Sequence, residues 1–161
     1  MAAANNLANT HVDMGNYDAA LPLMTENLER ARRLLGDDSA ETLTSMISLA
    51  ALHADMGRHD LALPLYRDAL QRGRRVLGNR HPRTLMTMQN MGHSLCCSGD
   101  TAAGIALLEE AVAGSTAVLG ADHPDTECTQ RNLDWAKQRE QEDEEDDETI
   151  ADRIRKRRRR A

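Results

Sequence analysis

A fixed interval of 42 residues separates the glycines of two independent series in this chain. The first series comprises Gly15, Gly57 and Gly99, and the second comprises Gly36, Gly78 and Gly120. The same interval separates Leu35, Leu77 and Leu119, and also Thr42, Thr84 and Thr126. Self-similarity at such a period indicates an array of repeats in which each unit packs against its neighbours.

Each unit is predicted to be a pair of helices. Glycine favours the left-handed conformation that closes a helix C-terminus, so the two series predict two helix ends per unit. Pro82 and Pro124 suit a first helical position, and Asp38 with Glu41 resembles a capping box. The predicted inner helices span about 1–14, 39–56, 81–98 and 123–140, and the predicted outer helices span about 17–35, 59–77 and 101–119.

The composition favours an all-α fold. Phe is absent and the aromatic residues are Trp135, Tyr17 and Tyr66, so Leu, Ala and Met must fill the interior, as suits packed helices. Two inner helices each carry a core-facing stripe at helical spacing. The stripes are Leu43, Met46, Leu49, Ala50, His53 and Met56 on one helix, and Leu85, Met88, Met91, Gly92 and Leu95 on the next.

The repeat resembles the tetratricopeptide repeat, in the 42-residue version found in kinesin light chains. The resemblance rests on the His-Pro-x-Thr segments that begin at His81 and His123, on Gly15-x-Tyr17-x-x-Ala20, on Asn6-Leu7-Ala8 and on Ala69-Leu70. Gly104 departs from the pattern, which has alanine there. A HEAT or armadillo array is the alternative for this period, but no motif of the chain matches it.

The resemblance implies a right-handed superhelical solenoid of antiparallel helix pairs. We expect a repeat solenoid over residues 1–140, with repeats at about 1–36, 37–78 and 79–120 and a C-terminal capping helix at 121–140. On that last helix polar residues stand where the core stripe should be: Glu127, Gln130, Asp134 and Lys137. Residues 141–161 are expected to form a charged tail, disordered or a frayed helix, because blocks of like charge bury no core.

The side of the inner helices opposite the core stripe is the candidate binding surface. Asn and Gln carry both donors and acceptors, which suits them to grip an extended peptide backbone. In kinesin light chains inner-helix asparagines are used in this way, and the resemblance implies the same here. The predicted groove residues are Asn5, Asn6, Asn9, Gln89, Asn90, His93, Arg131 and Asn132. Asp13, Thr44, Ile47, Asp55, Met86, Cys97 and Trp135 are predicted on the same side. Alternatively, the asparagines are solvated or bond to a neighbouring helix.

The spacing of His93, Cys96 and Cys97, with Cys128 as a fourth ligand, raises a metal site. Cys97 lies near the end of its predicted helix and Cys128 near the start of the next, which would separate them by about 15 Å. We therefore expect no metal, and no cofactor. The sequence also shows no Ser/His/Asp order, phosphate-binding glycine loop or paired carboxylates, so an enzyme is the weakest hypothesis.

The protein is expected to bind a protein or peptide partner as a cytoplasmic scaffold. Residues 140–148 contain eight acids and residues 153–160 seven bases, so a nuclear or nucleic-acid-associated adaptor acting through this Arg-rich tail is the alternative. Direct nucleic-acid binding is disfavoured because no stacking aromatics accompany the arginines. The sequence contains no run of eighteen apolar residues and so predicts no membrane span. Self-association is expected through Ala2, Ala3, Ala4 and Leu7, which have no preceding repeat to cover them.

Overall fold

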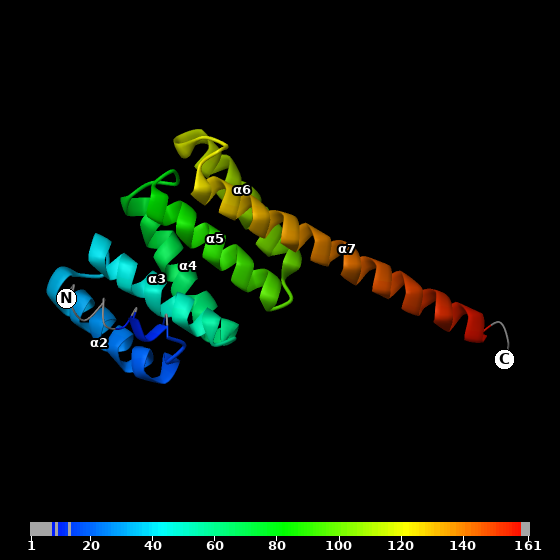
Figure 1. Ribbon diagram of the computed structural model, residues 1–161, viewed down its shortest axis with the longest axis horizontal. Coiled ribbons are helices and arrows are strands. Elements are labelled where there is room, and N and C mark those ends of the chain that lie inside the picture. Colours follow the sequence, from blue (N-terminus) through cyan, green and yellow to red (C-terminus); the bar gives the residue numbers. More distant parts are fainter. Residues whose placement is uncertain (1–7, 9, 13, 159–161) are drawn as a thin grey trace.

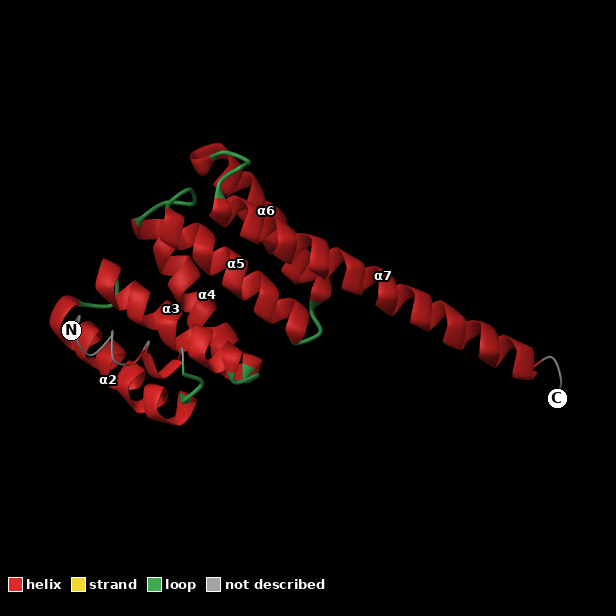
Figure 2. Cartoon of the chain, viewed as in Figure 1, coloured by secondary structure: helices red, strands yellow, loops and turns green. Residues whose placement is uncertain are grey.

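The computed structural model describes residue 8, residues 10–12 and residues 14–158. Within these residues the chain is helical with short connecting loops and no strand (Figure 2). The helices are α2 (Tyr17–Leu35), α3 (Ala40–Asp55), α4 (His59–Val76), α5 (Pro82–Cys97), α6 (Thr101–Leu119) and α7 (Pro124–Arg158). The predicted all-α class is confirmed, and the predicted ends of α2 to α6 agree with the observed ones to within one residue.

The helices pack in chain order to form a solenoid. Each of α2 to α6 contacts the next helix along the chain, and α5 also contacts α3 and α7 (Figure 1). The inner helices α3, α5 and α7 therefore form one layer, and the outer helices α2, α4 and α6 form the other. Most contacts lie between consecutive elements, as expected of an array in which each repeat is covered by its neighbours.

Six glycines end the helices as the two series predict. All six have positive φ, from 70° at Gly15 to 95° at Gly99, and within the described residues no other residue type has positive φ. L-residues with a side chain rarely adopt this conformation, whereas glycine adopts it without steric cost. The 42-residue spacing of these glycines therefore fixes where the chain reverses direction.

The His-Pro-x-Thr segments begin inner helices. Nδ1 of His81 accepts a hydrogen bond from the Arg83 backbone N–H at 3.2 Å, and Pro82 is the first residue of α5. His123 makes the same bond to the Asp125 N–H at 3.2 Å before α7 begins at Pro124. Proline has no N–H to leave unpaired at this position, so the histidine caps the next available donor.

The predicted capping box at Asp38 and Glu41 is wrong. Ser39 is the N-cap of α3, and its hydroxyl accepts from the Thr42 N–H at 3.1 Å. Asp38 instead receives Nη2 of Arg75 at 2.6 Å and Nη1 of Arg72 at 3.0 Å. The hydrogen bond from Arg72 is the largest cause that lowers the pKa of Asp38, a carboxylate that stays half exposed to solvent. Asp38 therefore pairs with two arginines of α4 that lie outside the capping motif, and the neighbouring Ser39 caps α3 instead.

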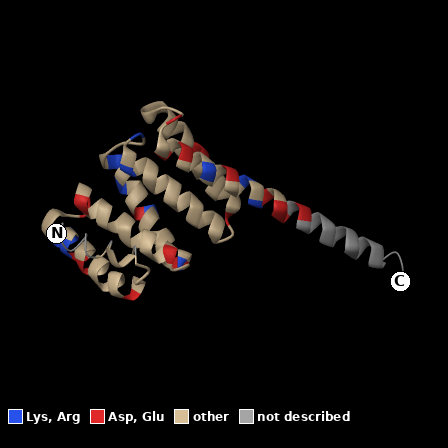
Figure 3. Ribbon diagram, in the orientation of Figure 1, with Lys and Arg blue, Asp and Glu red and all other residues tan. Residues whose placement is uncertain are grey.

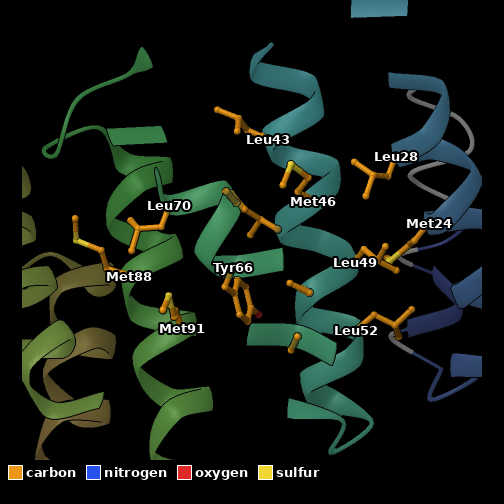
Figure 4. Close-up of a cluster of buried hydrophobic side chains, with 14 of the residues drawn as sticks. Met24, Leu28, Leu43, Met46, Leu49, Leu52, Tyr66, Leu70, Met88 and Met91 are labelled. Atoms are coloured by element: carbon orange, nitrogen blue, oxygen red, sulfur yellow. The ribbon is translucent and has the colours of Figure 1, made fainter. Parts of the chain in front are cut away.

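The core lies between the two layers and is filled by aliphatic and sulfur-containing side chains. Tyr66 of α4 is the largest fully buried residue. Leu43, Met46, Leu49 and Ala50 are buried as the predicted stripe requires, whereas His53 and Met56 are half-buried. Figure 4 shows Met24, Leu28, Leu43, Met46, Leu49, Leu52, Tyr66, Leu70, Met88 and Met91 converging between the helices.

Helices α5 and α6 approach closely where Gly92 faces Gly104. A Cβ atom built on Gly104 would lie 2.7 Å from the carbonyl oxygen of Gly92 and would overlap Cys96 Sγ. The second repeat has Ala50 and Ala54 at the positions of Gly92 and Cys96. The bulkier Cys96 sulfur therefore requires glycine on the facing helix, which explains why Gly104 departs from the alanine found at position 62.

The helix α7 continues through the segment predicted as a tail. It runs unbroken from Pro124 to Arg158, and Figure 1 shows it projecting beyond the other helices. Residues 124–140 are thus the first part of a longer helix, and the division at residue 140 stays a prediction. The four polar residues in the place of a core stripe are exposed, since no described helix covers them: Glu127, Gln130, Asp134 and Lys137.

The helix α6 is long and apolar enough to cross a membrane, judged by length and composition alone, with a mean hydropathy of 1.4. This evidence is weak, because a helix packed inside a repeat array meets the same criteria. Here α6 packs against both α5 and α7, and Glu109 and Glu110 lie near its centre.

The residues invoked for self-association, Ala2, Ala3, Ala4 and Leu7, lie outside the described part of the chain. Self-association therefore stays a prediction.

Replacing Leu49 by alanine is expected to lower the free energy of unfolding by about 2 to 5 kcal/mol, because the side chain is 6% exposed and its removal leaves a cavity. Leu61→Ala is the matched control, since Leu61 is 46% exposed and surface substitutions usually change stability by about 0.5 kcal/mol or less. Urea denaturation followed by circular dichroism measures both. Equal effects would show that the core stripe is misplaced.

Gly104→Ala is expected to destabilise the protein by about 1 to 3 kcal/mol through overpacking, despite the better helix propensity of alanine. Gly114→Ala in the same helix is the control. Its Cβ would meet only side-chain atoms of Leu85, which can move aside. We expect Gly114→Ala to be neutral or stabilising by up to about 1 kcal/mol. Thermal melts of the two variants should separate clearly, and coinciding melts would contradict the close approach of α5 and α6.

Candidate functional site

Equivalent positions on the inner helices form rows across the inner layer. Residues 42 apart in the sequence occupy the same place on neighbouring helices, and α5 contacts both α3 and α7. Three rows are Ser48, Asn90 and Asn132; Ala51, His93 and Trp135; and Asp55, Cys97 and Arg139. One pocket is lined largely by these rows, and a second pocket adjoins it at Asn90. We call the surface that contains both pockets the groove.

The first pocket, named here the Asp55 pocket, has a volume of about 270 Å³. Asn90 and His93 of α5 face Asp55 of α3 and Asn132 of α7 across it. The full lining is Ala51, Ala54, Asp55, Tyr66, Asn90, His93, Ser94 and Asn132. Asn132 is half-buried and makes no hydrogen bond to any described residue. Its amide is therefore available to a ligand.

The Tyr66 side chain reaches the Asp55 pocket from the outer helix α4. Its side chain is 1% exposed, so its hydroxyl is screened from bulk water. Burial raises the pKa of Tyr66 far above its usual value, the Asp55 carboxylate adds to the shift, and the Asn90 side chain opposes it. Tyr66 therefore stays protonated at neutral pH and places a neutral hydroxyl beside the Asn90 amide.

The second pocket, named here the α5–α7 pocket, has a volume of about 410 Å³. Its walls are largely apolar, with Leu85, Met86 and Leu119 among the lining residues. The full lining is Pro82, Arg83, Leu85, Met86, Gln89, Asn90, Ser115, Leu119, Asp125, Cys128 and Thr129. Met86 is 43% exposed, which leaves its flexible thioether free to adapt to a ligand.

Gln89 is held in place by α7. Its Oε1 accepts from the Thr129 hydroxyl at 2.9 Å, and its Nε2 lies 3.5 Å from Cys128 Sγ. The Thr129 hydroxyl also lies 2.8 Å from the Asp125 carbonyl oxygen, so it can be shared between two acceptors. Gln89 therefore bonds to a neighbouring helix, and only part of the hydrogen-bonding capacity of its amide remains for a ligand.

The C-terminal end of the groove holds a stack of three side chains. The His93 ring stacks on Trp135 with ring centroids 4.9 Å apart, and the Arg139 guanidinium lies 5.7 Å from the Trp135 ring centroid. Cys97 Sγ lies 3.8 Å from Nδ1 of His93. Burial is the main cause that lowers the pKa of His93, the nearby His59 lowers it further, and Asp55 opposes the shift. His93 is accordingly neutral at pH 7.

The structure brings together some of the predicted groove residues and separates others. Asn90, His93 and Asn132 line the Asp55 pocket, and Gln89 lines the α5–α7 pocket. Arg131 lies apart from both, because it lines a separate pocket with Thr116 of α6. Ile47, also predicted on this side, is buried in the core instead. Asn5, Asn6 and Asn9 lie outside the described residues.

Sequence reasoning missed Tyr66 as a groove residue. Tyr66 is on an outer helix, and only the packing of α4 behind α3 and α5 brings its hydroxyl to the pocket. Cys128 had been considered as a metal ligand and lines the apolar pocket instead. The 42-residue repeat could have placed Cys128 on the groove side, because Cys128 occupies the position on α7 that Met86 occupies on α5.

The cysteines do not gather with His93 into one cluster. Cys96 is buried with Sγ 3.9 Å from the Thr101 carbonyl oxygen, while Cys128 lies beside Gln89. In the described part of the chain no group of three or more His, Cys, Asp or Glu side chains is placed to hold a metal ion. The expected absence of a metal stays a prediction.

Comparison with protein families identifies the class of this protein. One tetratricopeptide repeat model matches residues 1–71 and 47–103, and a second tetratricopeptide repeat model matches residues 84–125. The matches span most of the chain, which therefore belongs to the tetratricopeptide repeat family. This family is typically a non-catalytic scaffold for protein interactions.

Solved structures show the same fold. The nearly identical TPR-like repeats of a Podosopora anserina protein assigned to the kinesin light chains give a TM-score of 0.81 at 22% identity, over 89% of this chain and 68% of that chain. BtubC (BKLC) from P. vanneervenii gives 0.74 at 20% identity, over 83% of this chain and 53% of that one. The chain thus spans about half the length of BtubC. A search of curated proteins gave no match.

Protonation of His93 is expected to occur below pH 6.5, because burial lowers its pKa in the folded protein. The folded state therefore binds this proton less readily than the unfolded chain, so stability falls as pH drops through 6.5 toward the lowered pKa. Trp135 is the single tryptophan, and a charge on the ring stacked against it should change its fluorescence. The emission of the native protein, recorded against pH, should have its midpoint below 6.5.

His93→Gln is the control for this titration, and it should remove the fluorescence step. The stability of this variant should still depend on pH, because burial also lowers the pKa of His53. A midpoint at or above 6.5 would contradict the buried, stacked position of His93.

Proposed function

We propose that the groove binds an extended segment of a partner protein, with the side-chain amides of Asn90 and Asn132 bonding the partner's backbone. The observation that carries this proposal is that both amides line the Asp55 pocket from adjacent helices. The Asn132 side chain has no hydrogen bond within the described chain, and the Asn90 side chain lies within hydrogen-bonding reach of the Tyr66 hydroxyl. Each amide offers a donor and an acceptor, which matches the N–H and C=O of a peptide unit.

The shape of the groove favours a chain segment over a compact ligand. The two pockets share Asn90 as a lining residue and follow one another along α5. Each has room for side chains, while the ridge between them offers hydrogen-bonding groups. Extended peptides in such sites gain affinity from main-chain bonds and specificity from pockets that take alternate side chains.

The helix α5 also suits a binding surface because it presents little charge. Arg83 is the only Lys, Arg, Asp or Glu of α5, and Figure 3 shows few charged residues on the visible side of α3 and α5. A polar but largely neutral surface loses less hydration on binding than one rich in charges. It is therefore suited to bury a peptide backbone.

Replacing Asn90 and Asn132 together by alanine is expected to weaken partner binding by about five-fold to a hundred-fold, since each lost hydrogen bond is worth about 0.5 to 1.5 kcal/mol. The Asn132 change should alter stability little, because its side chain makes no hydrogen bond within the described chain. The Asn90 change also removes the polar neighbour of the buried Tyr66 hydroxyl, so a modest loss of stability is expected from that substitution. Isothermal titration with a partner peptide identified by affinity purification measures the affinity, and a melting curve measures the stability.

The control is Asn79→Ala, in an exposed turn that lines neither pocket. A second control is the chain without residues 141–161. Binding that survives Asn90→Ala/Asn132→Ala but is lost with the tail would overturn the proposal and favour an adaptor that acts through its Arg-rich end.

A further inference from the structure

Asp55 is in an unfavourable place for a carboxylate in the unbound protein. It is the last residue of α3, where the negative end of the helix dipole disfavours an anion. Asp55 is exposed to solvent, but partial desolvation still raises its pKa, and His93, which opposes that shift, is itself biased toward its neutral form. The Asp55 side chain has no ion pair or hydrogen bond with any described residue.

None of the side chains around Asp55 gives this carboxylate a role in stabilising the fold. The remaining side chains of its pocket are uncharged at neutral pH: two asparagine amides, a tyrosine hydroxyl, a serine and two alanines, together with the neutral His93 ring. None of them compensates a negative charge as a lysine or arginine would. A cationic group entering the pocket would do so, and the Tyr66 hydroxyl and the amides would surround it with polar atoms.

The α5–α7 pocket has the opposite character. Leu85, Met86, Pro82 and Leu119 supply apolar wall, and the polar Gln89 is already bonded to Thr129. An apolar side chain that entered this pocket would be transferred out of water, and it would not break the hydrogen bond between Gln89 and Thr129. The pocket therefore suits Leu, Met or an aromatic side chain.

The two pockets have a definite spacing. Met86 of one and His93 of the other are seven positions apart on α5, which corresponds to about 10 Å at 1.5 Å per residue. An extended chain advances about 3.3 Å per residue, so about three residues of a bound segment cover that distance. Asn90, which lines both pockets, lies between the two and can bond the backbone that joins them.

We propose that the groove selects an extended segment in which an apolar side chain fills the α5–α7 pocket and a lysine or arginine about three residues away pairs with Asp55. This specificity rests on the proposed function, because it requires a peptide in the groove. It adds the sign of the partner's charge and the spacing of its two anchors. An acidic partner segment is excluded by the same argument, since it would bring a second negative charge to an uncompensated carboxylate.

The probe is a phage-displayed library of random linear peptides, selected in parallel on the full chain, on Asp55→Lys and on Asn90→Ala/Asn132→Ala. The full chain should enrich peptides with an apolar residue and a Lys or Arg about three positions apart. Asp55→Lys should enrich Asp or Glu at the position of the base. The asparagine double variant should enrich no common motif.

Affinities are then measured for a synthetic peptide from the wild-type selection. Asp55→Asn should weaken its binding by about ten-fold or more, because a charge-assisted hydrogen bond is lost. Met86→Asp should weaken it by placing a charge in the apolar pocket. Asp122→Asn, at an exposed loop position that lines neither pocket, should leave affinity unchanged. Asp55→Asn should melt at the wild-type temperature or slightly above it, so lost affinity cannot be attributed to unfolding.

The outcomes separate this inference from the function on which it rests. Selected peptides that need Asn90 and Asn132 but are acidic, or that bind Asp55→Asn as tightly as the wild type, would overturn the charge preference and leave groove binding intact. Peptides that bind equally well to the asparagine double variant and to Asp55→Lys would overturn both.

Discussion

The burial of the inner helices α3 and α5, each between two outer helices, is the constraint on which the rest of this structure depends. The helix α3 packs on α2 and α4, and α5 packs on α4 and α6, so the core-facing stripes are covered from both sides. Small residues make this possible: Ala50 and Ala62 are fully buried, and glycine replaces alanine at 92 and 104 where Cys96 takes more room. Outer helices could not otherwise approach closely enough to seal a core that contains so few aromatic residues.

The same packing leaves the remaining side of each inner helix without a covering helix. Its residues are under no demand to fill a core, and they carry the amides, the His93–Trp135 stack and the Asp55 carboxylate. Asp55 is the clearest example of a residue that the fold does not need, because it lies at a helix C-terminus without a cation beside it. Proteins often tolerate such local costs where a ligand relieves them.

Surface charges contribute differently in the two layers. On the outer side, Arg72 and Arg75 of α4 reach Asp38 in the loop before α3, and Arg74 bonds to Glu110 of α6 at 2.6 Å. The pairs with Asp38 lie within one repeat, and Arg74–Glu110 links two successive repeats. Exposed ion pairs are each worth about 1 kcal/mol or less, so they refine the stacking that apolar burial establishes. The inner side has few such pairs, which keeps its polar groups available.

The repeat, the helix boundaries from α2 to α6 and the core-facing stripes on α3 and α5 could all be predicted from the amino-acid sequence. Each depends on local chemistry: glycine at positive φ, proline at a first helical position, and apolar residues at helical spacing. It also placed Asn90, His93 and Asn132 on one side of the inner layer, because residues 42 apart share a position in a regular array.

Only the tertiary structure decided which of these side chains share a pocket. Tyr66 enters from the outer layer, Arg131 turns toward α6, and Gln89 is held by Thr129. Asp38 likewise does not form the predicted cap and instead bonds to Arg72 and Arg75, which are 34 and 37 residues away in the sequence. Helical periodicity states which residues lie on one face of a single helix. A pocket is formed by side chains from several helices, whose relative positions depend on how the packed residues between them fill space.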